Sequence, residues 1–253
     1  MTEAKDNIKL NIKESSKNSQ VKSKERVSEH GEVFTAEREV KAMCDLVYDE
    51  CLRVDSRFLE PACGDGNFLA EILSRKLSAV QSKYKKSTYD CERFSVLALT
   101  SIYGVDILAD NAESCRERLF KIWDSWYTSV CKSDCNDETR RSARYILSSN
   151  IVCGNALSMM CVDEKGEDTE QFIVFPEWTF PFNDARIKRR DFRFDVLLKE
   201  NNDDENYYEQ YSLFGDDSMG VENWMIDPLT NETVPKPIKE YPLINYRRLY
   251  ENG

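Results

Sequence analysis

Apolar and polar residues alternate along the chain with two different periods, which predict helices and strands in turn. From Ala36 to about Arg53, apolar residues recur at helical spacing, which indicates an amphipathic helix, and Thr35 is placed to cap its first turn. We expect the buried face of this helix to consist of Val40, Met43, Cys44, Val47 and Cys51.

A strand, a glycine-rich turn and a second helix follow. The short apolar run covers residues 57–60, the turn covers 61–67, and helical spacing extends from Phe68 to Val80. Farther on, helical patterns near 92–99, 108–130 and 138–147 flank two short strands, "SIYGVDI" and "NIVCGNAL". Because strands alternate with helix-length connections, we expect a Rossmann-like α/β fold, with a mostly parallel sheet and helices on both faces.

The two ends of the chain lack this alternation. Residues 1–30 are polar and rich in lysine, which predicts a disordered basic arm, either a weak nucleic-acid tether or a solubilising tail. Residues 31–200 form the predicted α/β domain, with late strands in "QFIVFPEWTFPF" and "DFRFDVLL". Residues 201–253 form an irregular acidic and aromatic tail, which we expect to pack on the domain or on a partner.

Charge and cysteine content limit the functions open to the chain. Its 253 residues carry a formal charge of −11, which argues against tight, unaided binding to a phosphate backbone. The one basic cluster, residues 186–193, could contact phosphate, form a solvated strand edge or dock an acidic neighbour. The nine cysteines are scattered and lack the spacing of a zinc finger, which indicates reduced thiols in a cytoplasmic protein. The sequence has no apolar run long enough to span a membrane.

Three polar or glycine-containing positions lie at the predicted strand ends, where open α/β sheets bind ligands. Gly64 and Gly66 allow a ligand to approach the main chain closely. Asp106 could accept both hydroxyls of a ribose, although an acidic helix cap explains it equally well. Asn155 could meet an adenine amino group, although a turn asparagine explains it taken alone.

Four segments carry a resemblance to a known family: "GEVFTAEREVKAMCDLV", "FLEPACGDGNFL", "IYGVDI" and "IVCGNAL". They resemble successive motifs of S-adenosylmethionine-dependent DNA adenine-N6 methyltransferases of restriction–modification systems, in the subgroup with an FTP-containing helix. The resemblance implies a class I methyltransferase fold with S-adenosylmethionine as cofactor. It also implies a cofactor site formed by Phe34, Thr35, Glu60, Ala62, Gly64, Gly66, Phe68, Asp106 and Asn155.

The sequence differs from the family's pattern at two positions in the cofactor half and in the loop that would bind the acceptor base. Ala36 stands where the family usually has proline, and the long span from Gly66 to Asp106 predicts an inserted helix. The family's Asn/Asp-Pro-Pro-aromatic loop should follow the strand expected at 194–198, but no proline pair is present there. Asn201 and Tyr207 are the remaining candidates for catalysis, and the single histidine, His30, lies outside the α/β pattern.

Three interpretations of the function follow from this combination. The chain could be an active DNA adenine methyltransferase, with a catalytic loop of its own or with one supplied by a companion methylase or restriction subunit, and with DNA bound through that partner or weakly by the chain itself. It could be a non-catalytic cofactor-binding or assembly subunit of a restriction–modification or phage-defence system. It could also methylate a substrate other than DNA, which its acidic charge would suit.

Overall fold

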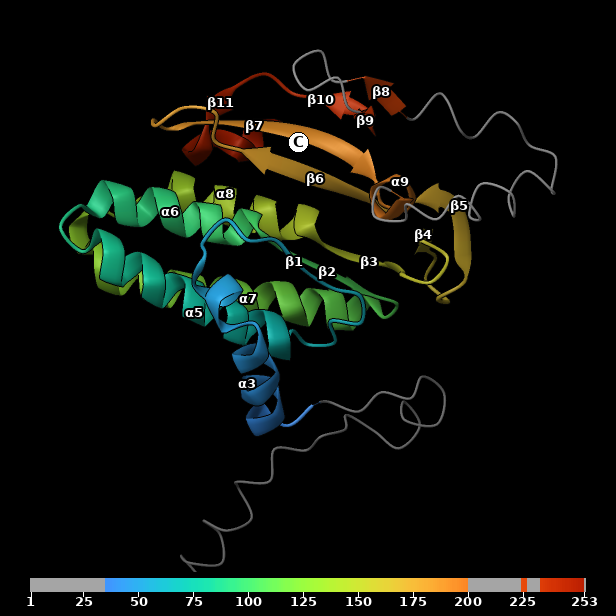
Figure 1. Ribbon diagram of the computed structural model, residues 1–253, viewed down its shortest axis with the longest axis horizontal. Helices are drawn as coiled ribbons and strands as arrows, with labels where there is room; N and C mark the ends of the chain where they lie inside the picture. The colour runs from blue at the N-terminus through green and yellow to red at the C-terminus, as the bar shows by residue number, and fades with distance from the viewer. Residues whose placement is uncertain (1–34, 200–223, 227–232, 253) are drawn as a thin grey trace, which may run out of the picture.

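The computed structural model describes residues 35–199, 224–226 and 233–252 (Figure 1). The helices are α3 (Glu37–Leu46), α4 (Tyr48–Leu52), α5 (Asn67–Tyr84), α6 (Thr88–Thr100), α7 (Ala109–Cys131), α8 (Asp137–Asn150) and α9 (Phe194–Lys199), with 3-10 turns η1 (Lys132–Asp134) and η2 (Tyr246–Asn252). The strands are β1 (Phe58–Glu60), β2 (Ile102–Asp106), β3 (Ile151–Asn155), β4 (Met160–Val162), β5 (Asp168–Phe172), β6 (Val174–Thr179), β7 (Arg186–Arg193), β8 (Trp224–Ile226), β9 (Thr233–Pro235), β10 (Lys239–Glu240) and β11 (Ile244–Asn245). Within these ranges, no helix is both long and apolar enough to cross a membrane.

The expected alternation of strands and helices is present from β1 to β3. These three strands pair in parallel, and β4 and β5 extend the sheet in antiparallel fashion, so the order is β1-β2-β3-β4-β5. The long connection between β1 and β2 contains α6 in addition to α5, which is the inserted helix that its length predicted. The fold is therefore mixed α/β, with a parallel half and an antiparallel half in one sheet.

The two faces of the parallel strands are covered by different structures. In Figure 1, α5 and α7 lie below the strands and the β6–β7 ribbon lies above them, with α6 and α8 between. Tyr103 on β2 donates a hydrogen bond from Oη to the carbonyl of Pro176 on β6 (2.8 Å), and its ring meets that of Phe175 edge-on. Helices therefore lie on both sides of the parallel strands, as expected, and the ribbon packs beside α6 and α8 through the buried side chains of Phe175, against Tyr103, and Trp178, against Tyr145 of α8.

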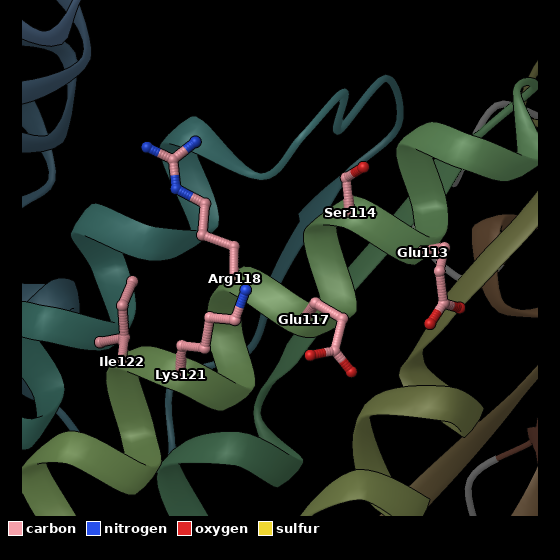
Figure 2. Close-up of a pocket in the computed structure, with 6 residues that line it drawn as sticks. All are labelled: Glu113, Ser114, Glu117, Arg118, Lys121 and Ile122. Carbon is pink, nitrogen blue, oxygen red and sulfur yellow. The ribbon is translucent and has the colours of Figure 1, made fainter.

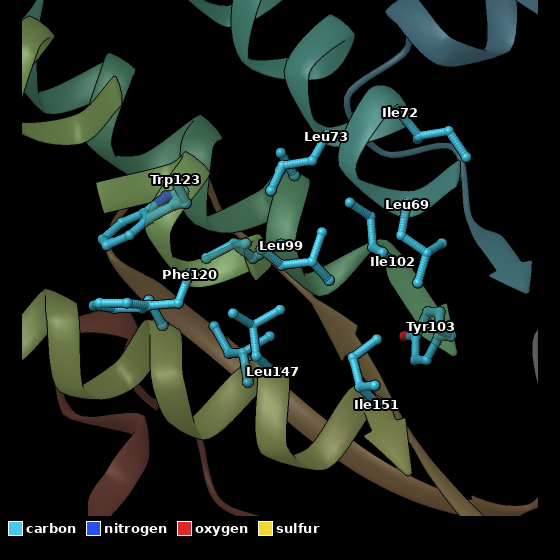
Figure 3. Close-up of a cluster of buried hydrophobic side chains, with 14 of the residues drawn as sticks. Leu69, Ile72, Leu73, Leu99, Ile102, Tyr103, Phe120, Trp123, Leu147 and Ile151 are labelled. Carbon is cyan, nitrogen blue, oxygen red and sulfur yellow. The ribbon is translucent and has the colours of Figure 1, made fainter. Parts of the chain in front are cut away.

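The core lies where α5, α7 and α8 meet the starts of the strands (Figure 3). The predicted apolar positions of α5 from Leu69 to Val80 are confirmed as buried, with Leu73 and Val80 fully inaccessible to solvent, whereas Phe68 is half-buried. Lys76 on α5 is a buried charge in this core, and its Nζ donates to the carbonyls of Arg53 and Val54 (both 3.0 Å), the carbonyl of Ser56 and the hydroxyl of Ser101. Burial lowers the pKa of Lys76 to about 8, and its bonds fix the link that leads into β1.

The N-terminal helix differs from its prediction. It divides at Val47, whose backbone angles (φ −119°, ψ 37°) are not helical, into α3 and α4. Ala36 is the N-cap residue and no side chain caps the first turn, so the expected cap by Thr35 is wrong. Val40, Cys44 and Cys51 are buried as predicted, whereas Met43 and Val47 are 53% and 45% exposed.

The late strands are confirmed only in part. β6 and β7 form an antiparallel ribbon, but the strand expected at 194–198 is the helix α9. The amide of Phe194 donates to the carbonyl of Ile173, which ends the ladder, and the Phe194 ring packs edge-on against Phe175. These contacts hold the chain against the ribbon after β7. The β propensity of residues 194–198 alone does not predict them.

The last described segment of the tail packs on the helices. Tyr246 in η2 is fully buried, and its Oη donates to Glu92 Oε1 on α6 (2.6 Å). The same oxygen accepts a bond from Arg247 Nε (2.6 Å), and Tyr127 donates to the other oxygen. Glu92 therefore joins α6, α7 and the end of the chain through one buried carboxylate.

Candidate functional site

The turn between β1 and α5, here called the glycine turn (residues 61–67), has two left-handed residues. Gly64 has a φ of 53° and Gly66 a φ of 88°, which are backbone angles that favour glycine. Cβ at residue 66 would lie 2.7 Å from Cys115 Sγ on α7. Gly66 is therefore required by the close approach of the turn to α7, whether or not a ligand binds here.

Asp106 joins the end of β2 to the glycine turn. Its Oδ2 accepts a hydrogen bond from the amide of Gly64 (2.8 Å), and its Oδ1 accepts from the amide of Leu108 (2.9 Å) and from Asn111 Nδ2 (3.2 Å). The structure thus brings the glycine turn and Asp106 together, as the sequence predicted. Asp106 thus also holds the residues that begin α7, as the helix-cap explanation requires, whereas a ribose contact stays a prediction, for which Oδ2 has a second lone pair.

Other predicted cofactor residues surround the same turn. Glu60 at the end of β1 is half-buried, and burial raises the pKa of its carboxyl, partly offset by a hydrogen bond from the backbone of Ala62. Ala62 is exposed at the tip of the turn, and Phe68 and Thr35 are half-buried. Phe34 lies outside the described residues.

Asn155 is engaged in a turn. Its Nδ2 donates to Asp168 Oδ1 (3.0 Å), and its Oδ1 accepts from the amide of Leu157 (3.0 Å). The carbonyl half of the side-chain amide therefore holds the turn from β3 to β4, as the turn explanation requires, and the amino half bonds the first residue of β5. An adenine contact by Asn155 would have to displace or share these bonds.

The Cys63 thiol in the glycine turn is not a reactive thiol. Cys63 is buried within the turn, and a hydrogen bond with Cys115 together with burial raises the pKa of its thiol far above the usual range. A thiol that stays protonated is a poor nucleophile, so Cys63 is not suited to covalent catalysis. All nine cysteines are free, and the described residues contain no cluster of three or more side chains suited to hold a metal ion.

A surface hollow of about 500 Å³ lies on the outer side of α7 (Figure 2). Arg118 from this hollow bonds Asp65 Oδ2 in the glycine turn (3.0 Å), and Glu117 pairs with Arg144 (2.7 Å). Asp65 Oδ1 is buried without a hydrogen-bond partner among the described residues. None of the predicted site residues lines the hollow, and no sequence motif indicated it. All of its lining residues come from α7: Glu113, Ser114, Glu117, Arg118, Lys121 and Ile122.

The basic cluster is the strand β7, and each of its cations is paired. Arg189 is held by Asp191 through two hydrogen bonds (2.6 and 2.9 Å) and lies over the Tyr241 ring. The other pairs are Arg186–Asp184, Lys188–Glu240, Arg190–Glu177 and Arg193–Asp195. The cluster therefore pairs with acidic residues of its own chain, an outcome that the sequence did not suggest, and its charge is largely neutralised.

The acceptor side stays a prediction. The segment expected to lead into the catalytic loop is α9, and Asn201 and Tyr207 lie outside the described residues. No protein-family model, no curated protein and no solved structure matches this chain. The described residues thus define a mixed α/β protein with a glycine turn joined to an acidic strand end, and the function has to be argued from that site.

Proposed function

We propose that this chain binds S-adenosylmethionine at the glycine turn and acts as a DNA adenine-N6 methyltransferase component whose acceptor loop comes from a companion subunit. The observation that carries the proposal is the hydrogen bond between the Gly64 amide and Asp106 Oδ2. It links a ligand-accommodating turn to a carboxylate at the neighbouring strand end. Ligands of open α/β sheets bind at this end of the strands.

The groups around the turn suit the polar ends of the cofactor. Asp106 Oδ2 has a lone pair for a ribose hydroxyl. No side chain caps the first turn of α5, so its amide groups, from Asn67 onward, suit a carboxylate. The half-buried carboxyl of Glu60 suits an ammonium group, which would offset the cost of its burial.

The bound cofactor would supply an electrophilic methyl group, and this chain would orient it. The acceptor base would need a stacking ring and hydrogen-bond acceptors beside that methyl group. The described residues supply no such loop, because residues 194–199 form α9. A companion subunit is therefore part of the proposal.

The paired cations of β7 favour a second candidate function. A strand whose five cations all meet carboxylates offers little charge to DNA, as a non-catalytic cofactor-binding or assembly subunit would require. Such a subunit would bind S-adenosylmethionine without transferring its methyl group. The two candidates share the donor site and differ in the reaction.

Calorimetry with S-adenosylmethionine tests the donor site. Ala62→Arg places a bulky side chain at an exposed position of the turn, so binding should be lost while the thermal denaturation midpoint is retained. Ala42→Arg, at an exposed position of α3, is the matched control and should bind as the unmodified chain does. Absence of binding by the unmodified chain contradicts both candidates.

Transfer of a tritiated methyl group to adenine-containing DNA separates the candidates. The purified chain alone should give no transfer, and transfer should arise when a companion methylase or restriction subunit is added. Failure of every such combination, with cofactor binding intact, favours the assembly subunit. Robust transfer by the chain alone would overturn the need for a companion.

A further inference from the structure

The two carboxylate oxygens of Asp106 are engaged to different degrees. Oδ1 accepts two hydrogen bonds, from the amide of Leu108 (2.9 Å) and from Asn111 Nδ2 (3.2 Å). Within the described residues, Oδ2 accepts one hydrogen bond, from the amide of Gly64 (2.8 Å). A carboxylate has about four lone-pair sites, shared equally between its oxygens. The chain itself therefore fills all but one of these sites, and the remaining one belongs to Oδ2.

Oδ1 is committed to the start of α7. Leu108 is the N-cap residue of this helix, and its own side chain makes no capping bond. Asp106 Oδ1 supplies the acceptor for the Leu108 amide, which is one of the donors that a helix start leaves unpaired. The positive end of the helix dipole also favours a negative charge at this position. Turning Oδ1 toward a ligand would therefore cost free energy.

Asn111 is a polar residue on the buried face of α7. It lies one helical turn before Cys115 and is 2% exposed, so the helical pattern alone predicts an apolar residue at this position. Burying a side-chain amide costs free energy unless the amide is hydrogen-bonded. The bond from Asn111 Nδ2 to Asp106 Oδ1 offsets part of this cost and fills the second site on that oxygen.

The approach to the Asp106 carboxylate is narrow. The residue is 8% exposed. The glycine turn contacts the carboxylate through Gly64, α7 contacts it through Asn111, and Cys153 of β3 lies beside Asp106 in the sheet register. A ligand group must therefore reach the carboxylate through a small opening, which suits one hydroxyl better than two.

We propose that Asn111 restricts Asp106 to a single ribose hydroxyl, so that the donor site recognises one of the two neighbouring hydroxyls of the cofactor and not the other. This inference rests on the proposed binding of S-adenosylmethionine and replaces the expectation that Asp106 accepts both hydroxyls. Asn111 acts through Asp106 and is therefore a positioning residue. It determines how strictly the site selects its ribose.

Calorimetry on the full chain with three ligands tests the number of recognised hydroxyls. The ligands are S-adenosylmethionine, its analogue without the 2′ hydroxyl and its analogue without the 3′ hydroxyl. One analogue should bind about tenfold more weakly than S-adenosylmethionine, because it loses a hydrogen bond to a charged group. The other analogue should bind within about twofold of S-adenosylmethionine, since its missing hydroxyl has no acceptor on Asp106.

Asn111→Ala tests the residue that sets this limit. The substitution frees one site on Oδ1 and leaves the bond from the Leu108 amide in place. The second hydroxyl then gains an acceptor, so both analogues should bind at least about threefold more weakly than S-adenosylmethionine. Ser114→Ala is the matched control, because it removes an exposed hydroxyl that bonds the Asp110 carbonyl on the same helix. This control should keep the pattern of the unmodified chain.

The ratio between the two analogues separates this role from a structural one. A variant that only disturbs the start of α7 weakens the binding of all three ligands in proportion and leaves the ratio unchanged. A change in the ratio reports the hydroxyl contacts themselves. The comparison of the two analogues on the unmodified chain needs no variant, so it decides the number of recognised hydroxyls even if Asn111→Ala does not fold.

The possible outcomes distinguish this inference from the proposed function. If S-adenosylmethionine binds and both analogues bind equally, whether equally weakly or equally well, the limit to one hydroxyl is wrong while the donor site stands. If one analogue binds weakly but folded Asn111→Ala keeps the same ratio, Asn111 does not set the limit. If S-adenosylmethionine does not bind at all, the proposed function fails and this inference fails with it.

Discussion

β2 and β7 are both central strands of their sheets, yet they handle polar residues in opposite ways. All five residues of β2 are buried, and its one charged residue, Asp106, stands at the end of the strand. β7 carries five cations along its length, and each is neutralised by a carboxylate. The charge at the strand end joins the glycine turn to the start of α7, whereas the charges along the paired strand hold the ribbon to its neighbours.

The comparison bears on how a basic cluster in a sequence is interpreted. "RIKRRDFR" suggested a phosphate contact because its cations are consecutive. Their partners lie on β6, on β10, in β7 itself, in α9 and in the turn before β7. Glu177 on β6 meets both Arg190 and Arg57. A run of cations thus indicates a nucleic-acid surface only if the fold does not bring carboxylates to it.

The largest effect is expected at the glycine turn. Gly66→Ala should lower the free energy of unfolding by about 3 kcal/mol, because Cβ would meet Cys115 Sγ and the residue has a positive φ. Urea denaturation measures this loss. Gly166→Ala, at a similar φ of 80° but in open space, is the control and should cost only about 1–2 kcal/mol.

Adding Cys115→Ala should recover part of the loss in Gly66→Ala. The double variant removes the sulfur that Cβ would strike, so the remaining cost is mainly that of the backbone angle. Equal losses for Gly66→Ala and Gly166→Ala would show that close packing does not explain the glycine.

A comparable effect is expected where the tail meets the helices. Glu92→Leu should cost about 3 kcal/mol, since Tyr127, Tyr246 and Arg247 would all lose their buried acceptor. Hydrogen exchange in η2 should also become faster. Glu71→Leu, which removes a partly exposed pair with Arg75 on α5, is the control and should cost about 1 kcal/mol or less.

A smaller effect is expected from unmasking the cations of β7. Glu177→Gln combined with Glu240→Gln frees Arg57, Lys188 and Arg190, and should raise the affinity for duplex DNA roughly tenfold at low salt. Fluorescence anisotropy measures the change. Glu164→Gln combined with Glu170→Gln alters the net charge equally at exposed positions near β5. An equal gain in this control would show that total charge, and not masking, limits DNA binding.

The smallest effect concerns Glu60. Because burial raises the pKa of its carboxyl in the folded state, Glu60 contributes stability below pH about 4.5 that is lost as the pH rises through the folded pKa. Glu60→Gln, which does not ionise, should therefore gain stability relative to the unmodified chain between pH ~4 and pH ~7. If the denaturation midpoints of Glu60→Gln and of the unmodified chain changed equally with pH across this range, the raised pKa of Glu60 would be contradicted.

Most of the parallel half could be predicted from local patterns. The predicted buried positions of α5, the strands β1 to β3 and the inserted helix α6 agree with the structure. One failure lies where distant residues intervene, because contacts of Phe194 with Ile173 and Phe175 accompany the replacement of a strand by α9. Another lies at Val47, where non-helical backbone angles divide the N-terminal helix.

The sequence by itself determined the periodic elements and the meeting of Gly64 with Asp106. Helical and strand periods are local, and the carboxyl ends of adjacent parallel strands must meet at one edge of the sheet. Only the tertiary structure decided that Lys76 is buried and that Lys188 and Arg190 of β7 meet carboxylates on other strands. Those outcomes depend on partners far away in the chain, such as Glu240 for Lys188, and no local period encodes them.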